Sequence, residues 1–245
     1  MRRALFALGA AGIAATYFAG VRGLPPAGGY RGVYGELLNQ VAVGERHATD
    51  VVSAVNFDYR GLDTLGEEFI LFASVAAVAA ILRRQKDEQD DEDEQKWQPR
   101  KAPDSDAVRV LGVAMVPLLV CYGLYMISHG SISPGGGFQG GVVLATAPLM
   151  VYLCAHTRAF LEIAPQGMVK AVEAAGAAGY ALIGCLGLLA SKAFLENVLP
   201  LGTAGSAWSS GTILFLNLAV GVAVGAGFVE LLATFIEEVL RREAR

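Results

Sequence analysis

Long apolar runs separated by polar segments dominate the chain. Six runs carry few or no charged residues, at positions 4–21, 65–82, 108–128, 140–155, 171–190 and 212–234. A helix that crosses a bilayer needs about 20 mostly apolar residues, with a range of about 17–25. The pattern therefore predicts an all-α integral membrane protein with six transmembrane helices.

The polar segments between these runs predict how the chain is divided. Residues 22–64 form a long connection, and its stretches 36–44 and 47–57 have the apolar spacing of short surface helices. Residues 83–107 contain a dense acidic run, which favours a solvated linker over a packed element. We therefore expect a two-helix unit at 1–82, an acidic cytoplasmic linker at 83–107 and a four-helix domain at 108–245.

The basic residues predict an orientation. With the N-terminus inside, 14 of the 19 lysines and arginines fall in inner segments and the rest in outer ones. Positively charged residues are enriched on the cytoplasmic side of membrane proteins. The distribution predicts a multi-pass protein of the cell membrane with both termini in the cytoplasm and the 22–64 connection outside.

Composition agrees with this class and excludes others. Hydrophobic residues make up 54% of the chain and charged residues 17%, and no basic stripe indicates nucleic-acid binding. The three cysteines lie far apart inside apolar runs, which predicts neither a metal site nor a disulfide framework. No catalytic or cofactor motif is apparent, so we expect a protein that is not an enzyme and holds no cofactor or metal.

A glycine-rich segment lies between the third and fourth runs. It reads HGSISPGGGFQGG from His129 to Gly141, and glycine this dense does not hold a regular element. Irregular backbone at a membrane border persists only when it is buried in protein or lines a wet cavity. We therefore expect a packed or functional turn, which Pro134 and Phe138 shape and in which glycine carbonyls are candidate sodium ligands.

Acidic residues precede the second run. Asp63 or Thr64 is expected to cap its helix, with Glu67 in the first turn near the outer membrane edge. A charge at a bilayer centre costs about 2.5–3.5 kcal/mol on insertion scales and less near the interface, and ionisable groups inside a membrane are functional candidates. Capping remains the alternative role for Asp63 and Glu68.

Two stretches resemble known proteins. The segment from His129 to Gly141, with its Pro-Gly-Gly-Gly-Phe core, resembles the signature of the MnhB subunit of the multisubunit Mrp (or Mnh) sodium/proton antiporters, over about residues 107–245. Relatives occur in membrane-bound hydrogenases and related energy-converting complexes. Residues 49–67, with DYRGLDTLGE from Asp58, resemble the two-helix unit that ends the large MnhA subunit of those antiporters. The resemblance implies a fusion of two neighbouring elements.

The resemblance implies a non-catalytic subunit that helps to form the sodium route beside large antiporter-like subunits and small subunits, with sodium and protons as the transported ions. Glu67 matches the acidic residue of the family, Asp58 and Asp63 bring cations to the outer mouth, and Arg60 pairs with one of them. His129 either relays protons or bonds to carbonyls of the glycine segment. The structural motif comprises Arg60, Pro134, Gly135, Gly136, Gly137 and Phe138, and secondary candidates are Glu230 and Lys192.

Other functions stay open at this point. Small residues recur four apart, as at Gly221 and Gly225, which suits close helix packing and therefore a purely structural role in assembly. Membership of a redox-driven membrane complex is equally consistent with the resemblance. A self-sufficient carrier is disfavoured because no inverted repeat is evident.

Overall fold

The computed structural model describes residues 2–24, 28, 32–82, 105–155 and 157–243. They divide into two compact units, Met1–Leu38 and Asn39–Arg245. The first unit contains α1 (Arg2–Arg22), and α2 (Val33–Arg46) begins there and ends in the second unit. The acidic segment of the expected linker lies outside the described residues.

The second unit is an all-helical bundle. After α3 (Val51–Ala54) and a π-helix, η1 (Val55–Tyr59), its elements are α4 (Gly61–Ile81), α6 (Asp106–Ser128), α7 (Gly137–Cys154), α8 (Thr157–Ile163), α9 (Gln166–Leu189) and α10 (Thr212–Glu243). Five helices of the described part are long and apolar enough to cross a membrane: α4, α6, α7, α9 and α10. The chain is therefore a multi-pass membrane protein, while a sixth span in α1 stays a prediction.

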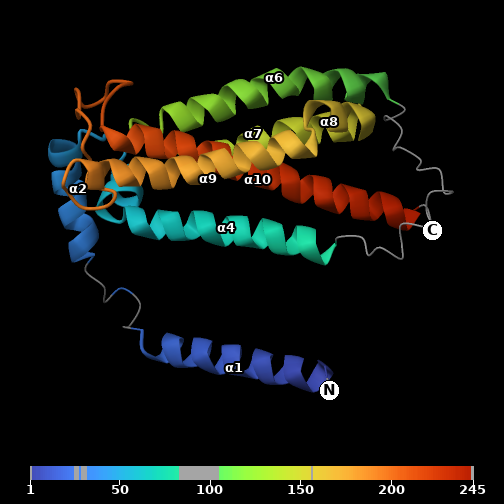
Figure 1. Ribbon diagram of the computed structural model, residues 1–245, viewed down its shortest axis with the longest axis horizontal. Helices are drawn as coiled ribbons and strands as arrows, with labels where there is room; N and C mark the ends of the chain where they lie inside the picture. The colour runs from blue at the N-terminus through green and yellow to red at the C-terminus, as the bar shows by residue number, and fades with distance from the viewer. Residues whose placement is uncertain (1, 25–27, 29–31, 83–104, 156, 244–245) are drawn as a thin grey trace. The chain divides into compact units, whose positions relative to one another are not determined.

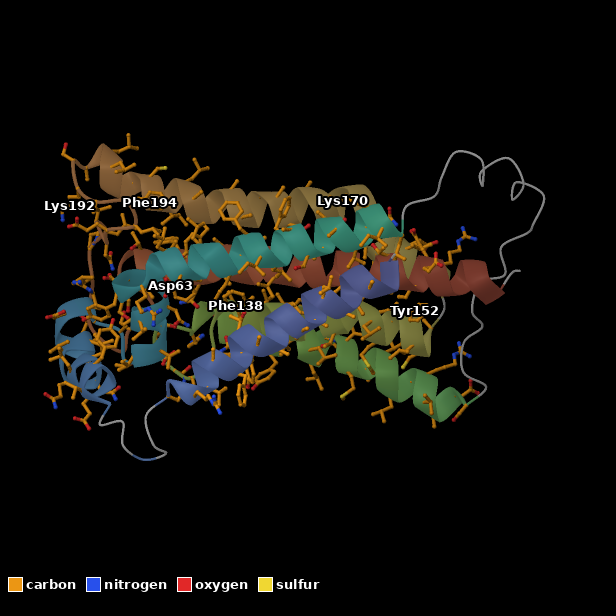
Figure 2. The ribbon with its side chains drawn as sticks, turned by 90° about the horizontal axis from the view of Figure 1, so that it is seen from below. Asp63, Phe138, Tyr152, Lys170, Lys192 and Phe194 are labelled. Atoms are coloured by element: carbon orange, nitrogen blue, oxygen red, sulfur yellow. The ribbon has the colours of Figure 1, made fainter. Side chains whose placement is uncertain are left out.

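The long helices run side by side along the bundle (Figure 1). Helix α10 lies at the centre and packs against α4, α7 and α9, and α6 packs against α7. We call the end that carries residues 47–61, 129–136 and 190–211 the loop end, and the end that carries Leu82, Gln166 and Glu237 the pocket end. Asp63 and Lys192 lie toward the loop end and Lys170 toward the pocket end (Figure 2).

Small residues bring the helices together. A Cβ added at Gly176 of α9 would lie 2.5 Å from the backbone nitrogen of Ala223 in α10, and one at Gly141 of α7 would lie 2.9 Å from the carbonyl oxygen of Gly221. Backbones this close need glycine at the contact. The small-residue faces predicted from the sequence thus pack within this chain.

Helices α4 and α9 begin several residues earlier than expected, α10 ends later, and α8 is an additional helix. Helix α4 begins at Gly61, with Arg60 as its N-cap residue and no capping side chain, so the expected cap at Asp63 or Thr64 is wrong. Thr64 instead donates to the carbonyl of Asn56, which anchors α4 on η1. Helix α10 continues beyond residue 234 to Glu243, and its 32 residues give a length of about 48 Å against a hydrocarbon core of about 30 Å. The short α8 had no signal in the apolar pattern.

Candidate functional site

Three carboxylates are buried between α4, α9 and α10. Glu68 is 3% exposed, Glu173 5% and Glu230 9%. Each comes from a different helix, and each lies inside a segment long and apolar enough to span the membrane. We call Glu68, Glu173 and Glu230 the carboxylate array.

The array is continuous at its pocket end. Glu173 and Glu230 share a side-chain hydrogen bond, and Lys170 Nζ lies 3.5 Å from Glu230 Oε1. A hydrogen bond between two carboxyl groups requires a proton on one of them. The two carboxyl groups therefore lie within hydrogen-bonding reach of each other, with Lys170 beside them as a cation.

Space for this pair comes from Gly227 of α10. A Cβ at Gly227 would lie 2.9 Å from Glu173 Oε1 and 3.7 Å from Val75 Cγ2. The Glu173 side chain thus crosses the face of α10 toward α4. Glycine here leaves room for the Glu173 carboxylate, which a larger side chain would push aside.

Glu68 lies at the other end of the array, in electrostatic range of Glu173. Within the part of the chain that the structure describes, its Oε1 is buried without a hydrogen-bond partner. Buried polar groups are nearly always hydrogen-bonded, and an exception calls for an explanation such as a functional role or a bound water or ion. The described residues contain no group of three or more His, Cys, Asp or Glu placed to hold one metal ion, so the array is a row of groups rather than a cage.

The glycine-rich segment forms a tight turn between α6 and α7, packed on Asn217 of α10. Asn217 Oδ1 accepts the backbone N–H of Gly137 at 2.9 Å, and its Nδ2 donates to the carbonyl of Ile213. Ser53 donates to the carbonyl of Gly130. A Cβ at Gly137 would lie 2.5 Å from the carbonyl oxygen of Asn217. These contacts hold the turn, although the buried Ser131 hydroxyl has no hydrogen-bond partner among the described residues.

Several carbonyls of this turn accept hydrogen bonds from the protein. Those of residues 130–132 accept from Ser53, from the N–H of Asp50 and from Thr49. Gly135 and Gly136 have φ values of 154° and 129°, which side chains rarely adopt. Pro134 is exposed and Phe138 is partly buried against the core. These glycines build a packed turn in which the carbonyls of residues 130–132 are used within the protein, while sodium binding by glycine carbonyls stays a prediction.

Charges at the loop end form separate pairs. Arg46 Nε lies 2.7 Å from Asp58 Oδ1, and Arg60 pairs with Asp63 on the surface, as the sequence predicted for one of these acids. Burial raises the pKa of Asp58, and the Arg46 charge offsets part of that rise. Burial and the Glu45 carboxylate raise the pKa of Tyr59 to about 12.

The remaining predicted residues, apart from Glu230, lie outside the carboxylate array. Glu67 is exposed on α4, one position from buried Glu68. His129 caps the end of α6, where its ring stacks on Tyr125 with 4.3 Å between centroids and its Nδ1 contacts Ser128 Oγ. Lys192 pairs with Glu196 on the surface. Of the predicted residues, Glu230 alone belongs to the carboxylate array.

Sequence reasoning missed Glu173 and Lys170, and left capping as the alternative role for Glu68. Gly61, Thr64, Glu68 and Val75 form the buried face of α4, with helical spacing that is visible in the sequence. Lys170 and Glu173 are the only charged residues of α9, in an otherwise apolar helix. Isolated charged residues inside apolar spans indicated candidate sites in the sequence. Which of these residues are buried together depends on which helix faces pack against each other.

A bundle of apolar helices with ionisable side chains buried inside its spans defines a multi-pass membrane protein with candidate functional groups within the membrane. Residues 107–230 match the family described as a domain related to the MnhB subunit of Na+/H+ antiporter. The chain belongs to this MnhB-related family, as the glycine-rich signature predicted.

Solved structures show the same fold. A chain of the membrane-bound sulfane sulfur reductase, an archaeal respiratory membrane complex, is 26% identical with a TM-score of 0.70, covering 96% of this chain and 98% of that one. A chain of the Mrp complex from Dietzia sp. is 24% identical with a TM-score of 0.66. That match covers 95% of this chain and 26% of the Dietzia chain, so this chain spans about a quarter of it.

An uncharacterised protein of Methanocaldococcus jannaschii is also similar. It is 29% identical over an alignment of 209 positions, and the match covers 78% of this chain and 78% of that protein. The similarity therefore extends beyond the matched family domain. The expected fusion of an MnhA-like unit with an MnhB-like domain stays a prediction.

Proposed function

We propose that this chain is a non-catalytic subunit of a sodium/proton antiporter complex and that its carboxylate array forms part of the ion route. The burial of three carboxylates from three spanning helices carries this proposal, because such groups are costly inside a membrane unless they are used. Membership of the MnhB-related family supports the antiporter class.

The proposal places the chain among several membrane subunits of the cell membrane, with its termini in the cytoplasm. The match to a chain of an archaeal respiratory membrane complex supports such partners. Glu67 is exposed beside buried Glu68, so a large antiporter-like or a small subunit that covers α4 brings Glu67 into the same route. Asp58, Asp63 and His129 lie toward the outer mouth in this arrangement.

Glu68→Gln in the assembled complex tests the proposal. The amide keeps the size of the side chain and removes its titration, so sodium-driven proton movement in membrane vesicles should fall at least about 10-fold, as for loss of a positioned acid–base group. Glu162→Gln is the control, because Glu162 is exposed and pairs with Arg158 on the surface. If complexes that contain Glu68→Gln assemble in normal amounts and exchange sodium for protons at the normal rate, the array is not part of the ion route. An assembly role for the chain would then remain.

A redox-driven complex is the second candidate. The match to the archaeal sulfane sulfur reductase chain favours it, since 98% of that chain is covered. Ion movement measured in membrane vesicles distinguishes an antiporter from a redox-driven complex. An antiporter moves protons when a sodium gradient alone is imposed, whereas a redox-driven complex moves ions when its electron donor is supplied.

A further inference from the structure

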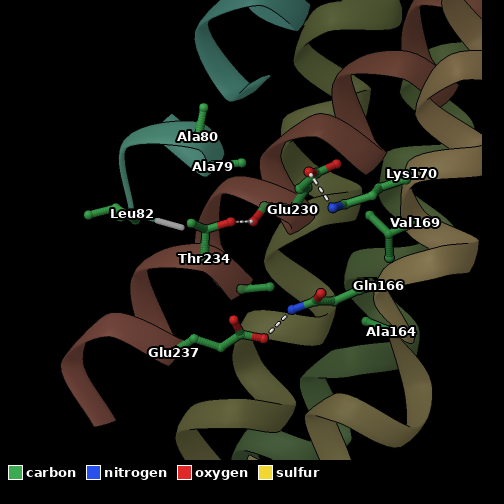
Figure 3. A pocket seen from close by; sticks show the side chains of 11 residues that line it. Ala79, Ala80, Leu82, Ala164, Gln166, Val169, Lys170, Glu230, Thr234 and Glu237 are labelled. Carbon is green, nitrogen blue, oxygen red and sulfur yellow. Dashed lines mark hydrogen bonds and ion pairs between the residues drawn. The ribbon is translucent and has the colours of Figure 1, made fainter. Parts of the chain in front are cut away.

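A pocket of about 510 Å³ opens at the pocket end between α4, α9 and α10. Its lining includes Ala79 of α4, Lys170 and Gln166 of α9, and Glu230 and Thr234 of α10 (Figure 3). Charged and polar side chains line the pocket together with alanines and aliphatic side chains, and a pocket of this size with polar walls suits water. The Glu230 side chain lines this pocket and also bonds to Glu173, so it joins the pocket to the array.

The side of the array that faces the loop end is packed differently. Tyr180 is fully buried, donates to the carbonyl of Gly61 at 2.8 Å and lies 6.3 Å from Phe57 between ring centroids. These rings belong to an apolar cluster with Leu216 and Val220 of α10. The array therefore meets a polar pocket at one end and close-packed aromatic and aliphatic side chains at the other.

Glu230 has two competing partners. Lys170 lies 3.5 Å from its Oε1, while Glu173 shares the side-chain hydrogen bond. The other charged groups nearby are Glu68 on α4 and Glu237 on α10, and Glu237 is bonded to Gln166. Helix α7, which also packs on α10, carries no charged residue. Among these groups, Lys170 is thus the cation that lies beside Glu230.

We propose that this pocket is the aqueous mouth through which protons reach the carboxylate array, and that Lys170 is the residue that positions Glu230 to receive them. This inference rests on the proposed function and adds the side of access and its controlling residue. A hydronium ion in the pocket transfers its proton to a Glu230 carboxylate oxygen. The proton then passes to a Glu173 oxygen whose own proton has already moved on toward Glu68. Glu230 is left as the anion that Lys170 stabilises, so charge and protons balance.

Thiol accessibility tests the mouth independently of transport. In a chain whose Cys121, Cys154 and Cys185 are replaced by alanine and which still exchanges ions, Ala79→Cys should react with a charged, membrane-impermeant thiosulfonate. The reaction is expected only when the reagent is on the pocket-end side. Ala145→Cys is the control and should stay unmodified, because Ala145 is 2% exposed in an apolar cluster.

Sodium/proton exchange by complexes with Lys170 variants tests whether Lys170 positions Glu230. Lys170→Met should slow exchange about 2- to 5-fold, as expected for a partly exposed ion pair, and should move its pH profile. Lys170→Arg should restore both. An unreactive Ala79→Cys, labelling only from the loop-end side, or a pH profile unchanged in Lys170→Met would overturn the inference. The Glu68→Gln result is separate, because normal exchange in that variant overturns the proposed function instead.

Discussion

The glycine turn and the carboxylate array lie in the same bundle and differ in which polar groups they bury: mainly backbone groups and one serine hydroxyl in the turn, and ionisable carboxyls in the array. In the turn, Asn217 and Ser53 satisfy buried backbone groups, and glycines fill contacts that no other residue fits. In the array, Glu68 keeps an unpartnered buried oxygen, and one lysine faces two linked carboxyls. The turn therefore stabilises the protein, whereas the array costs stability and is the better candidate for function.

This comparison separates two kinds of sequence signal. The conspicuous glycine motif identifies the family and builds a close contact between α6, α7 and α10. The less conspicuous charges inside α4, α9 and α10 carry the candidate ion chemistry. Variants in the turn should therefore lower thermal stability, whereas variants in the array should lower ion exchange.

Gly137→Ala should have the largest effect on stability. Its Cβ would lie 2.5 Å from the carbonyl oxygen of Asn217 and 2.7 Å from Val220 Cβ, and overpacking of this kind typically costs about 1–3 kcal/mol. Thermal unfolding in detergent should show the loss. Gly167→Ala is the matched control, because nothing lies within 4 Å of its added Cβ. Equal melting temperatures for the two variants would show that close packing at Gly137 does not stabilise the bundle.

Asn217→Ala should destabilise the bundle somewhat less. It leaves the N–H of Gly137 buried without its acceptor, at a cost of about 1–3 kcal/mol, but creates no clash. Exchange per assembled complex should stay near the parent value. Gln139→Ala, on the exposed side of the same region, serves as control. A strong loss of exchange with unchanged stability would place Asn217 in the ion route and break the comparison.

Arg46→Gln sharpens the comparison with a buried acid that does have a partner. Because burial already raises the pKa of Asp58 and Arg46 lowers it, the variant should raise this pKa further. A raised folded-state pKa means that stability falls as the pH rises from the ordinary carboxyl range through the folded value. The variant should therefore be less stable than the parent at pH 7, by about 1–3 kcal/mol, and the deficit should shrink toward pH 4.

The double variant Arg46→Gln/Asp58→Asn is the control for this titration. It removes both charges, so its stability should vary less with pH than that of Arg46→Gln. A deficit of equal size at pH 4 and pH 7 would mean that Arg46 acts by packing, for example through its contact with the Tyr59 ring.

Much of the fold could be predicted from the apolar pattern. Five long helices fall where the runs predicted them, and the short helices of the 22–64 connection are present as α2, α3 and η1. The start of α4 was missed because its first turn is polar and packs on η1 through Thr64. The array was missed because burial depends on which faces of α4, α9 and α10 meet, and no local pattern gives that register.

Exchange by Glu173→Gln tests the central claim most directly, because Glu173 links the other two carboxylates. Sodium-driven proton movement should be measured in vesicles and expressed per assembled complex. The account predicts a fall of at least about 10-fold, with a melting temperature equal to or above that of the parent. Exchange at the parent rate in a fully assembled complex would contradict it.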